Sequence, residues 1–144
     1  MRVIFKYITI IASIVLIACS TNSNISKKEK FNIDNANYEI LLPKEYQKVI
    51  IDNGGESSEI RFIFSDSATL FFTTSNSATP LLNRFLSQKD YIKFIDEEVL
   101  QYEFSENGKI FFLEKRNRLF KGYANVPKKD KAKIDRVLST LQKK

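Results

Sequence analysis

The chain has 144 residues and a formal net charge of +6, with twelve Phe, six Tyr, no Trp, no His and one Cys. This length is typical of one domain of ordinary size. The lack of His and the single Cys exclude His-based catalytic triads, His metal ligands and internal disulfides, and the modest charge does not indicate a nucleic-acid-binding surface.

The first nineteen residues combine a positive start, an apolar run and a terminal cysteine. Arg2 and Lys6 stand at the start, and the apolar run covers Ile8–Ala18. A secretory signal has about 7–15 apolar residues before a small-residue cleavage site, whereas a membrane-spanning helix needs about 20 apolar residues. The segment ends in Leu16-Ile17-Ala18-Cys19, which resembles the lipobox of bacterial lipoproteins.

This resemblance implies cleavage between Ala18 and Cys19, diacylglycerol attachment to the Cys19 sulfur, and acylation of the new amino terminus by a chain such as palmitate. Several acyl chains are needed, because one chain gives only marginal membrane binding. The alternatives are an uncleaved anchor and a buried free thiol. Ser20 and the neutral Thr21–Asn24 that follow favour an outer-membrane location facing the periplasm, as in lipoproteins sorted by these positions.

Residues 1–18 are therefore predicted to be a signal peptide, and residues 19–144 would carry a net charge of about +4. Residues 19–30 are polar, with Ile25 as the single apolar side chain, which predicts a flexible tether. Residues 31–144 are predicted to form one domain. Membrane attachment through the lipid and an envelope protein partner are expected, with no nucleic acid partner and no cofactor.

Alternating apolar and polar residues predict most of the domain to be β-structure. The expected strands are 38–42, 48–52, 60–64, 69–74, 99–105, 110–114 and 119–126. Asn53-Gly54-Gly55 and Asn107-Gly108 are typical of tight hairpin turns. Thr79-Pro80 predicts the start of a middle helix that continues to Glu97.

A last helix is expected after Pro127, with Asp130 as its N-cap. Its apolar face consists of Ile134, Val137, Leu138 and Leu141. The fold class is therefore α+β: an antiparallel sheet of about six to seven strands packed with a middle helix and a C-terminal helix. The segments YEILLP (38–43) and IDRVLSTL (134–141) are similar to the first strand and last helix of PsbP-like periplasmic domains. This resemblance implies a fold and no functional residue.

Two groups of charged residues are candidates for chemistry. Asp96-Glu97-Glu98 is the densest acidic cluster. Such carboxylates can act in acid–base catalysis or bind a hard cation. Three in succession cannot share one helical face, so we favour a solvated helix end. We predict no catalytic residue and no metal site.

The second group is basic. Lys115, Arg116 and Arg118 surround one turn, and Arg forks bind phosphate or carboxylate bidentately. Three more cations stand just before or at the start of the last helix: Lys128, Lys129 and Lys131. Together with Lys27, Lys28 and Lys30 they can hold the domain against an anionic membrane. For the turn we favour the alternative that its charges prevent aggregation at the sheet edge. For the last helix we favour the alternative of a solvated face.

The sequence thus predicts a membrane-anchored periplasmic lipoprotein with a non-enzymatic binding, assembly or immunity-type role. The alternative is a carrier or sensor of a small apolar or anionic ligand held between sheet and helix. The pairs Phe71-Phe72 and Phe111-Phe112 are expected in the core, because consecutive aromatics within strands are buried from both sides.

Overall fold

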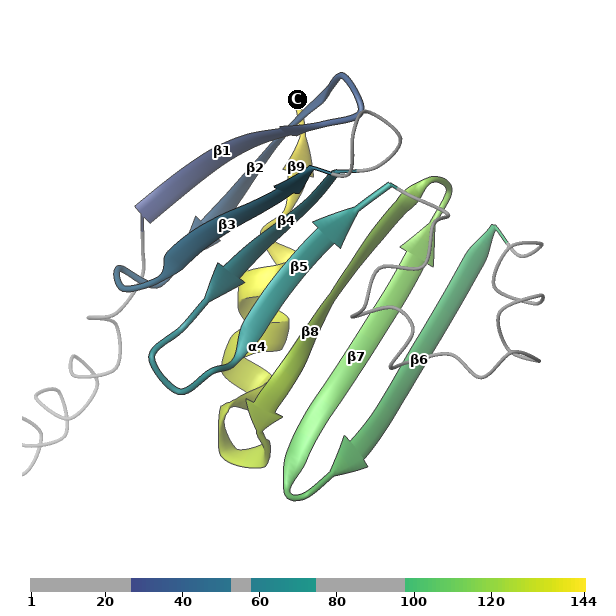
Figure 1. Cartoon of the computed structure of the whole chain (residues 1–144). Coiled ribbons are helices and arrows are strands. Elements are labelled where there is room, and N and C mark those ends of the chain that lie inside the picture. Colours follow the sequence, from purple (N-terminus) through teal and green to yellow (C-terminus); the bar gives the residue numbers. More distant parts are fainter. Residues whose placement is uncertain (1–26, 53–57, 75–97) are drawn as a thin grey trace, which may run out of the picture.

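A computed structural model describes residues 27–52, 58–74 and 98–144 (Figure 1). In these ranges the chain forms two antiparallel sheets and one α-helix. The large sheet has six strands in the order β3-β4-β5-β8-β7-β6, and the small sheet has three in the order β1-β2-β9. The bounds are β1 Lys27–Ile33, β2 Ala36–Leu42, β3 Gln47–Asp52, β4 Ser58–Ile63, β5 Thr69–Thr73, β6 Val99–Glu106, β7 Lys109–Arg116, β8 Leu119–Pro127, the 3₁₀ turn η2 Lys128–Asp130, α4 Lys131–Ser139 and β9 Gln142–Lys143.

Residues with positive φ make three of the hairpins. Asn107 and Gly108, with φ of 50° and 73°, join β6 to β7 as predicted. Asp34 and Asn35, with φ of 50° and 59°, join β1 to β2. Asn117, with φ of 56°, lies in the turn from β7 to β8. Asn, Asp and Gly tolerate this conformation better than other residues.

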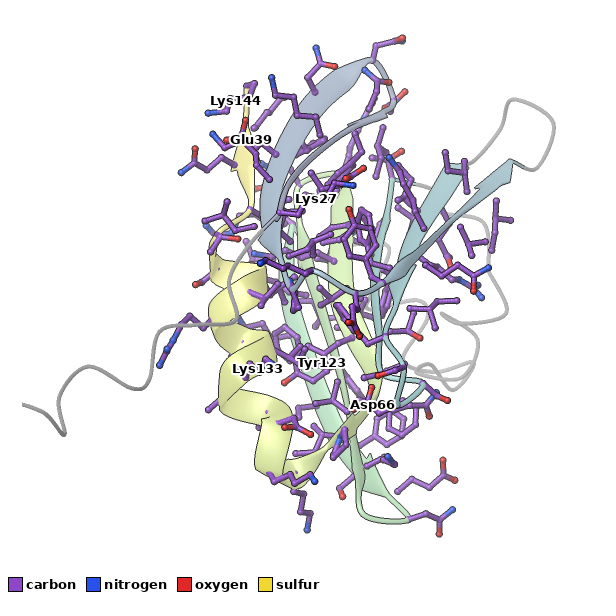
Figure 2. The ribbon with its side chains drawn as sticks, turned by 90° about the vertical axis from the view of Figure 1, so that its left-hand side faces the viewer. Lys27, Glu39, Asp66, Tyr123, Lys133 and Lys144 are labelled. Carbon is purple, nitrogen blue, oxygen red and sulfur yellow. The ribbon has the colours of Figure 1, made fainter. Side chains whose placement is uncertain are left out.

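One face of the large sheet is covered by α4 and the small sheet, which lie on the same side of it (Figure 2). The shared core is apolar and aromatic, and Phe62, Leu70, Phe72 and Tyr123 contribute to it from the large sheet. Phe31, Ile33, Tyr38, Ile40 and Leu42 from the small sheet and Ile134, Val137 and Leu138 from α4 complete it. Three of the four residues predicted for the apolar face of the last helix are thus confirmed, whereas the fourth, Leu141, lies two residues beyond the end of α4 and is partly buried against the same core.

The opposite face of the large sheet carries a second buried cluster. It contains Phe71, Phe111, Leu113, Phe120 and Ala124, with Phe104 stacked on Phe111 at 4.7 Å between ring centroids. Phe71 and Phe72 are buried on opposite faces, and so are Phe111 and the half-buried Phe112. The prediction that these aromatic pairs belong to the core is confirmed.

Several expectations need correction. The described residues contain nine strands, more than the six to seven that were expected. The two additional strands are β1 and the short β9, which were not predicted because their sequences have no clear alternating pattern. β1 starts at Lys27, so residues 27–30 are part of a strand and not of a tether. Asp130 stands at the N-cap position but its side chain makes no cap hydrogen bond; the Lys131 N–H bonds to the Lys128 carbonyl in η2 instead.

Two expectations lie outside the described residues. The middle helix was expected within residues 80–97, and the turn Asn53-Gly54-Gly55 falls within residues 53–57. The pairing of Asp52 with Ser58 is observed, so β3 and β4 do form the expected hairpin. The coarse fold class, a mostly antiparallel β domain with a C-terminal helix, agrees with the prediction.

Candidate functional site

The structure separates the basic residues that the sequence grouped. Arg116 and Arg118 are exposed at the turn between β7 and β8. Lys115 points to the other face of the sheet, where its Nζ lies 5.8 Å from the centroid of the Phe120 ring and the residue is 6% exposed. Lys128 and Lys129 are exposed at the far end of β8, beside the start of α4 (Figure 1). The predicted anion contacts therefore do not form one patch.

Arg116 and Arg118 instead line a cavity with residues from other elements, which we call the basic pocket. It has a volume of about 450 Å³, and Lys121 of β8 and Lys143 of β9 add two more cations. Asp34 is the carboxylate among the described residues that line it. Four cations and one carboxylate give this lining a net charge of about +3, which favours an anionic ligand.

Part of the lining of the basic pocket is apolar. Ile33, Ala36, Leu119 and Leu141 line it together with the ring of Tyr38. Burial and the nearby negative charge of Asp34 raise the pKa of the Tyr38 phenol, so this hydroxyl stays protonated and can donate a hydrogen bond at neutral pH. The pocket thus suits a ligand with a phosphate or carboxylate group and an apolar portion.

A buried carboxylate stands behind two of these cations. Glu114 is 7% exposed, and its carboxylate lies 3.5 Å from Arg116 Nε and 3.5 Å from Lys121 Nζ. A buried charge must be paired, so the ion pairs with Glu114 hold the side chains of Arg116 and Lys121 in place. The exposed fraction of the Arg116 side chain is 68%, which leaves its guanidinium available to a ligand.

Lys131 belongs to a different cluster, which ties α4 to the large sheet. Its Nζ lies 2.8 Å from Asp135 Oδ2 and 3.2 Å from Glu103 Oε2. The Tyr123 hydroxyl donates to Asp135 Oδ1 at 2.9 Å. The hydrogen bond from Lys131 to Asp135 raises the pKa of Lys131, and burial and the bond to Asp135 raise that of Tyr123. Lys131 is therefore a structural cation rather than a free membrane contact.

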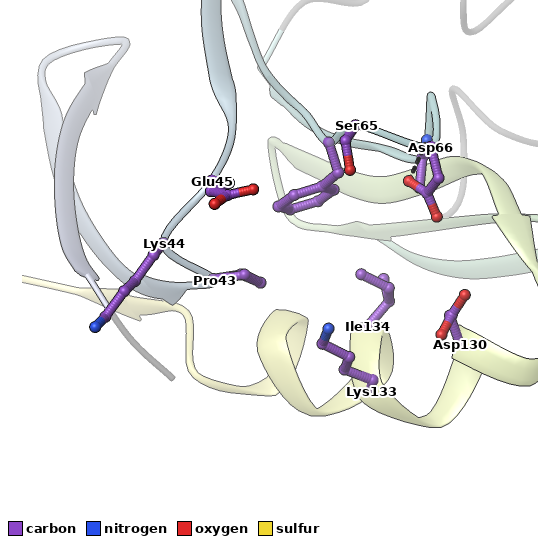
Figure 3. Close-up of a pocket in the computed structure, with 10 residues that line it drawn as sticks. Pro43, Lys44, Glu45, Ser65, Asp66, Asp130, Lys133 and Ile134 are labelled. Atoms are coloured by element: carbon purple, nitrogen blue, oxygen red, sulfur yellow. Dashed lines mark hydrogen bonds between the residues drawn. The ribbon is translucent and has the colours of Figure 1, made fainter. Parts of the chain in front are cut away.

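A second cavity lies between the start of α4 and the loops that join β2 to β3 and β4 to β5, with a volume of about 340 Å³ (Figure 3). Pro43, Phe64, Ala68 and Ile134 supply its apolar lining. Its charged residues are Lys44, Glu45, Asp66, Asp130 and Lys133. Asp66 accepts a hydrogen bond from the Ala68 N–H at 3.1 Å, and the mixture of charges makes this cavity less selective for anions than the basic pocket.

Buried acids occur where the sequence indicated wet positions. Glu59 is 1% exposed and pairs with Arg61 through one oxygen, while its Oε2 has no hydrogen-bond partner. Glu59 pairs across the ladder with Thr73, and Thr73 with Phe120 of the second cluster. Glu114 pairs with Lys121, which is opposite Phe72 of the first core. The two carboxylates are on opposite faces of the large sheet and do not face each other.

The structure shows no site at the remaining predicted residues. Ala18, Cys19, Asp96 and Glu97 lie outside the described residues, and Glu98 is exposed. Within residues 27–52, 58–74 and 98–144, no group of three Asp, Glu, His or Cys side chains is arranged to hold a metal ion. No helix in these ranges is long and apolar enough to cross a bilayer.

Sequence reasoning missed three charged residues of the basic pocket: Asp34, Lys121 and Lys143. Asp34-Asn35 was an available signal, since both residues tolerate positive φ and stand between two strands. No comparable signal places Lys143 beside Arg118. Comparison with protein-family models, with curated proteins and with solved structures finds no match to this chain.

Proposed function

We propose that the protein is a bacterial envelope lipoprotein, anchored through lipid on Cys19, whose domain has a non-enzymatic binding role in assembly or immunity. The observation that supports a binding role is the basic pocket, an open cavity lined by four cations and several apolar side chains. The resemblance of residues 1–19 to a signal peptide with a lipobox supports the anchor. Ser20 and the neutral residues after it favour the periplasmic face of the outer membrane.

A second candidate is a carrier or sensor of a small ligand. The cavity between the start of α4 and the loops after β2 and β4 favours it, because apolar and charged side chains together line a volume that suits a small molecule (Figure 3). The two candidates differ in what occupies the cavities. A partner protein would insert an acidic segment into the basic pocket, whereas a carrier would retain a ligand after purification.

Crosslinking and mass spectrometry on intact envelopes distinguishes them. The wild type should crosslink reproducibly to one envelope protein through lysines beside the basic pocket, such as Lys143. Cys19→Ala should lose these crosslinks, because the untethered protein leaves the membrane. Arg118→Glu should lose them while the protein stays in the membrane fraction.

An extractable small molecule in the purified wild type, without a reproducible protein crosslink, would favour the carrier. Crosslinks that survive both substitutions would argue against a binding role for the basic pocket.

A further inference from the structure

The small sheet and α4 share one outer side, which we call the outer face. Both elements bury their inner side chains against the same face of the large sheet, so their opposite sides point away from it together (Figure 2). On β1 the buried residues are Phe31 and Ile33, which places Lys28 and Lys30 on the outer side. On α4, Arg136 is exposed on the side away from the buried Ile134 and Leu138.

The outer face is strongly positive. Its exposed cations are Lys28, Lys30, Arg136 and Lys144. Among the described residues of β1, β2 and β9, Glu39 is the carboxylate that alternation places on this side. Four cations and Glu39 give this face a charge of about +3, and Asp135 of α4 is not counted because it is paired with Lys131.

Glu39 does not neutralise the outer face, since two cations already share it. Its Oε1 lies 2.9 Å from Lys28 Nζ and 3.6 Å from Lys144 Nζ. The hydrogen bond from Lys28 and the nearby charge of Lys144 hold the pKa of Glu39 below its usual value despite the opposing effect of burial. The pairing fixes the two lysines next to each other and leaves an excess of positive charge.

The start of the domain lies beside this outer face. β1 begins at Lys27, so Ser20–Ser26 alone separate the lipidated residue from the domain. A fully extended chain of this length spans at most about 25–30 Å, which is a few Debye lengths at physiological ionic strength, where one is about 8 Å.

The point of attachment is fixed to the large sheet. Glu29, two residues after Lys27, accepts hydrogen bonds from Tyr46 at 2.6 Å and from Lys48 of β3 at 2.9 Å. The Lys27 Nζ lies 5.6 Å from the centroid of the Tyr46 ring. The first residues of β1 are thus tied to the domain and present Lys28 and Lys30 close to the end of the anchor segment.

We propose that the outer face is a membrane-docking surface, and that it binds the anionic phospholipid headgroups of the leaflet that holds the lipid anchor. The docking geometry rests on the proposed function, because the anchor brings Lys27 to the bilayer. Each cation close to an anionic membrane strengthens binding about fivefold. The docked domain would turn the opposite face of the large sheet, which carries the cluster of Phe71 and Phe111, toward the periplasm.

Vesicle sedimentation at physiological salt tests the surface without the lipid. The protein is the mature chain, residues 19–144, with Cys19→Ser, mixed with vesicles of phosphatidylcholine alone or with one third phosphatidylglycerol. Lys30→Gln with Arg136→Gln removes two cations from the outer face. Lys28 and Lys144 are left in place because their ion pairs to Glu39 connect β1 and β2 with the end of the chain.

Lys109→Glu is the matched control, since it lowers the net charge by the same two units at the turn between β6 and β7, away from the outer face and outside the lining of the basic pocket. We expect binding to the anionic vesicles only, a loss of about 25-fold for the outer-face variant, and a change of less than about threefold for the control. All three proteins should have the same melting temperature.

Equal losses in both variants would show that overall charge, not the outer face, drives binding. No binding of the unsubstituted chain to anionic vesicles would overturn the docking surface outright. Neither result depends on the anchor: if Cys19 proves to carry no lipid while the outer-face variant behaves as expected, the anchor is wrong and the docking surface stands.

Discussion

Gly122 of β8 is the position where a single methyl group should damage the domain most clearly. Phe71 is its cross-strand partner on β5 and covers it. A Cβ added at Gly122 would lie 2.8 Å from Phe71 Cζ and well inside van der Waals contact of the Phe112 carbonyl oxygen. The neighbouring strands hold that carbonyl on β7, so neither neighbour can move without breaking packing or ladder hydrogen bonds.

The expected destabilisation follows from these two contacts. Overpacking a well-filled site costs about 1–3 kcal/mol, and each ladder hydrogen bond that is lost adds about 1 kcal/mol. Gly122→Ala should therefore lower the free energy of unfolding by about 3–4 kcal/mol, a large share of the total of about 5–15 kcal/mol that is typical of a domain. For a domain of this size the melting temperature should fall by about 10–15 °C.

Gly108→Ala is the matched control, since a Cβ there meets no atom within 4 Å. Its cost should come only from the φ of 73°, at about 1 kcal/mol. Urea unfolding followed by circular dichroism measures both variants. If Gly122→Ala unfolds at the same urea concentration as Gly108→Ala, the packing of Phe71 on β8 is not as described.

Three further predictions concern the charged clusters. Tyr123→Phe should lower the free energy of unfolding by about 1.5 kcal/mol in urea titration, because Asp135 loses a charge-assisted hydrogen bond; no change would show that this bond is not made in solution. Stability should fall in two pH windows in thermal melts, and both falls should be smaller in a Glu29→Gln, Tyr46→Phe double variant. Hydrogen bonds from Tyr46 and Lys48 outweigh burial and lower the pKa of Glu29, so its contribution is present above pH 4.5 and lost as pH falls through that lowered pKa. Burial and the bond to Glu29 raise the pKa of Tyr46 from 10 to about 12, so its contribution is complete below pH 10 and lost as pH rises toward 12. Arg118→Gln should weaken binding of dodecyl phosphate to the basic pocket about tenfold by calorimetry, whereas Lys109→Gln should leave it unchanged, and equal affinities for the two variants would exclude the pocket as the site.

Seven of the strands and the last helix could be predicted because their local patterns agree with their final environments. β8 alternates between two buried faces, and Asn107-Gly108 has the φ values that its hairpin requires. β1 could not be predicted in the same way, since KKEKFNI contains two apolar residues among five polar ones. Its identity as a strand depends on Phe31 and Ile33 reaching a core made by distant residues.

The sites were predicted less well than the fold, because they form between elements far apart in the chain. Arg116 and Arg118 were found as a basic turn, but Lys143 joins them through the pairing of β9 with β2. Lys115 is adjacent in sequence and faces the other side of the sheet, as the period of two requires. Glu59 and Glu114 are buried although the sequence indicated wet positions for them, since the half-buried cations Arg61 and Lys121 pair with them.

Intact-protein mass spectrometry of the membrane-extracted protein tests the central proposal most directly. We expect a chain that starts at Cys19, with a mass increased by a diacylglyceryl group and one acyl chain, and a Cys19→Ala protein that lacks this increase. A wild-type protein that still carries residues 1–18, with no added lipid and in the soluble fraction, would contradict the account.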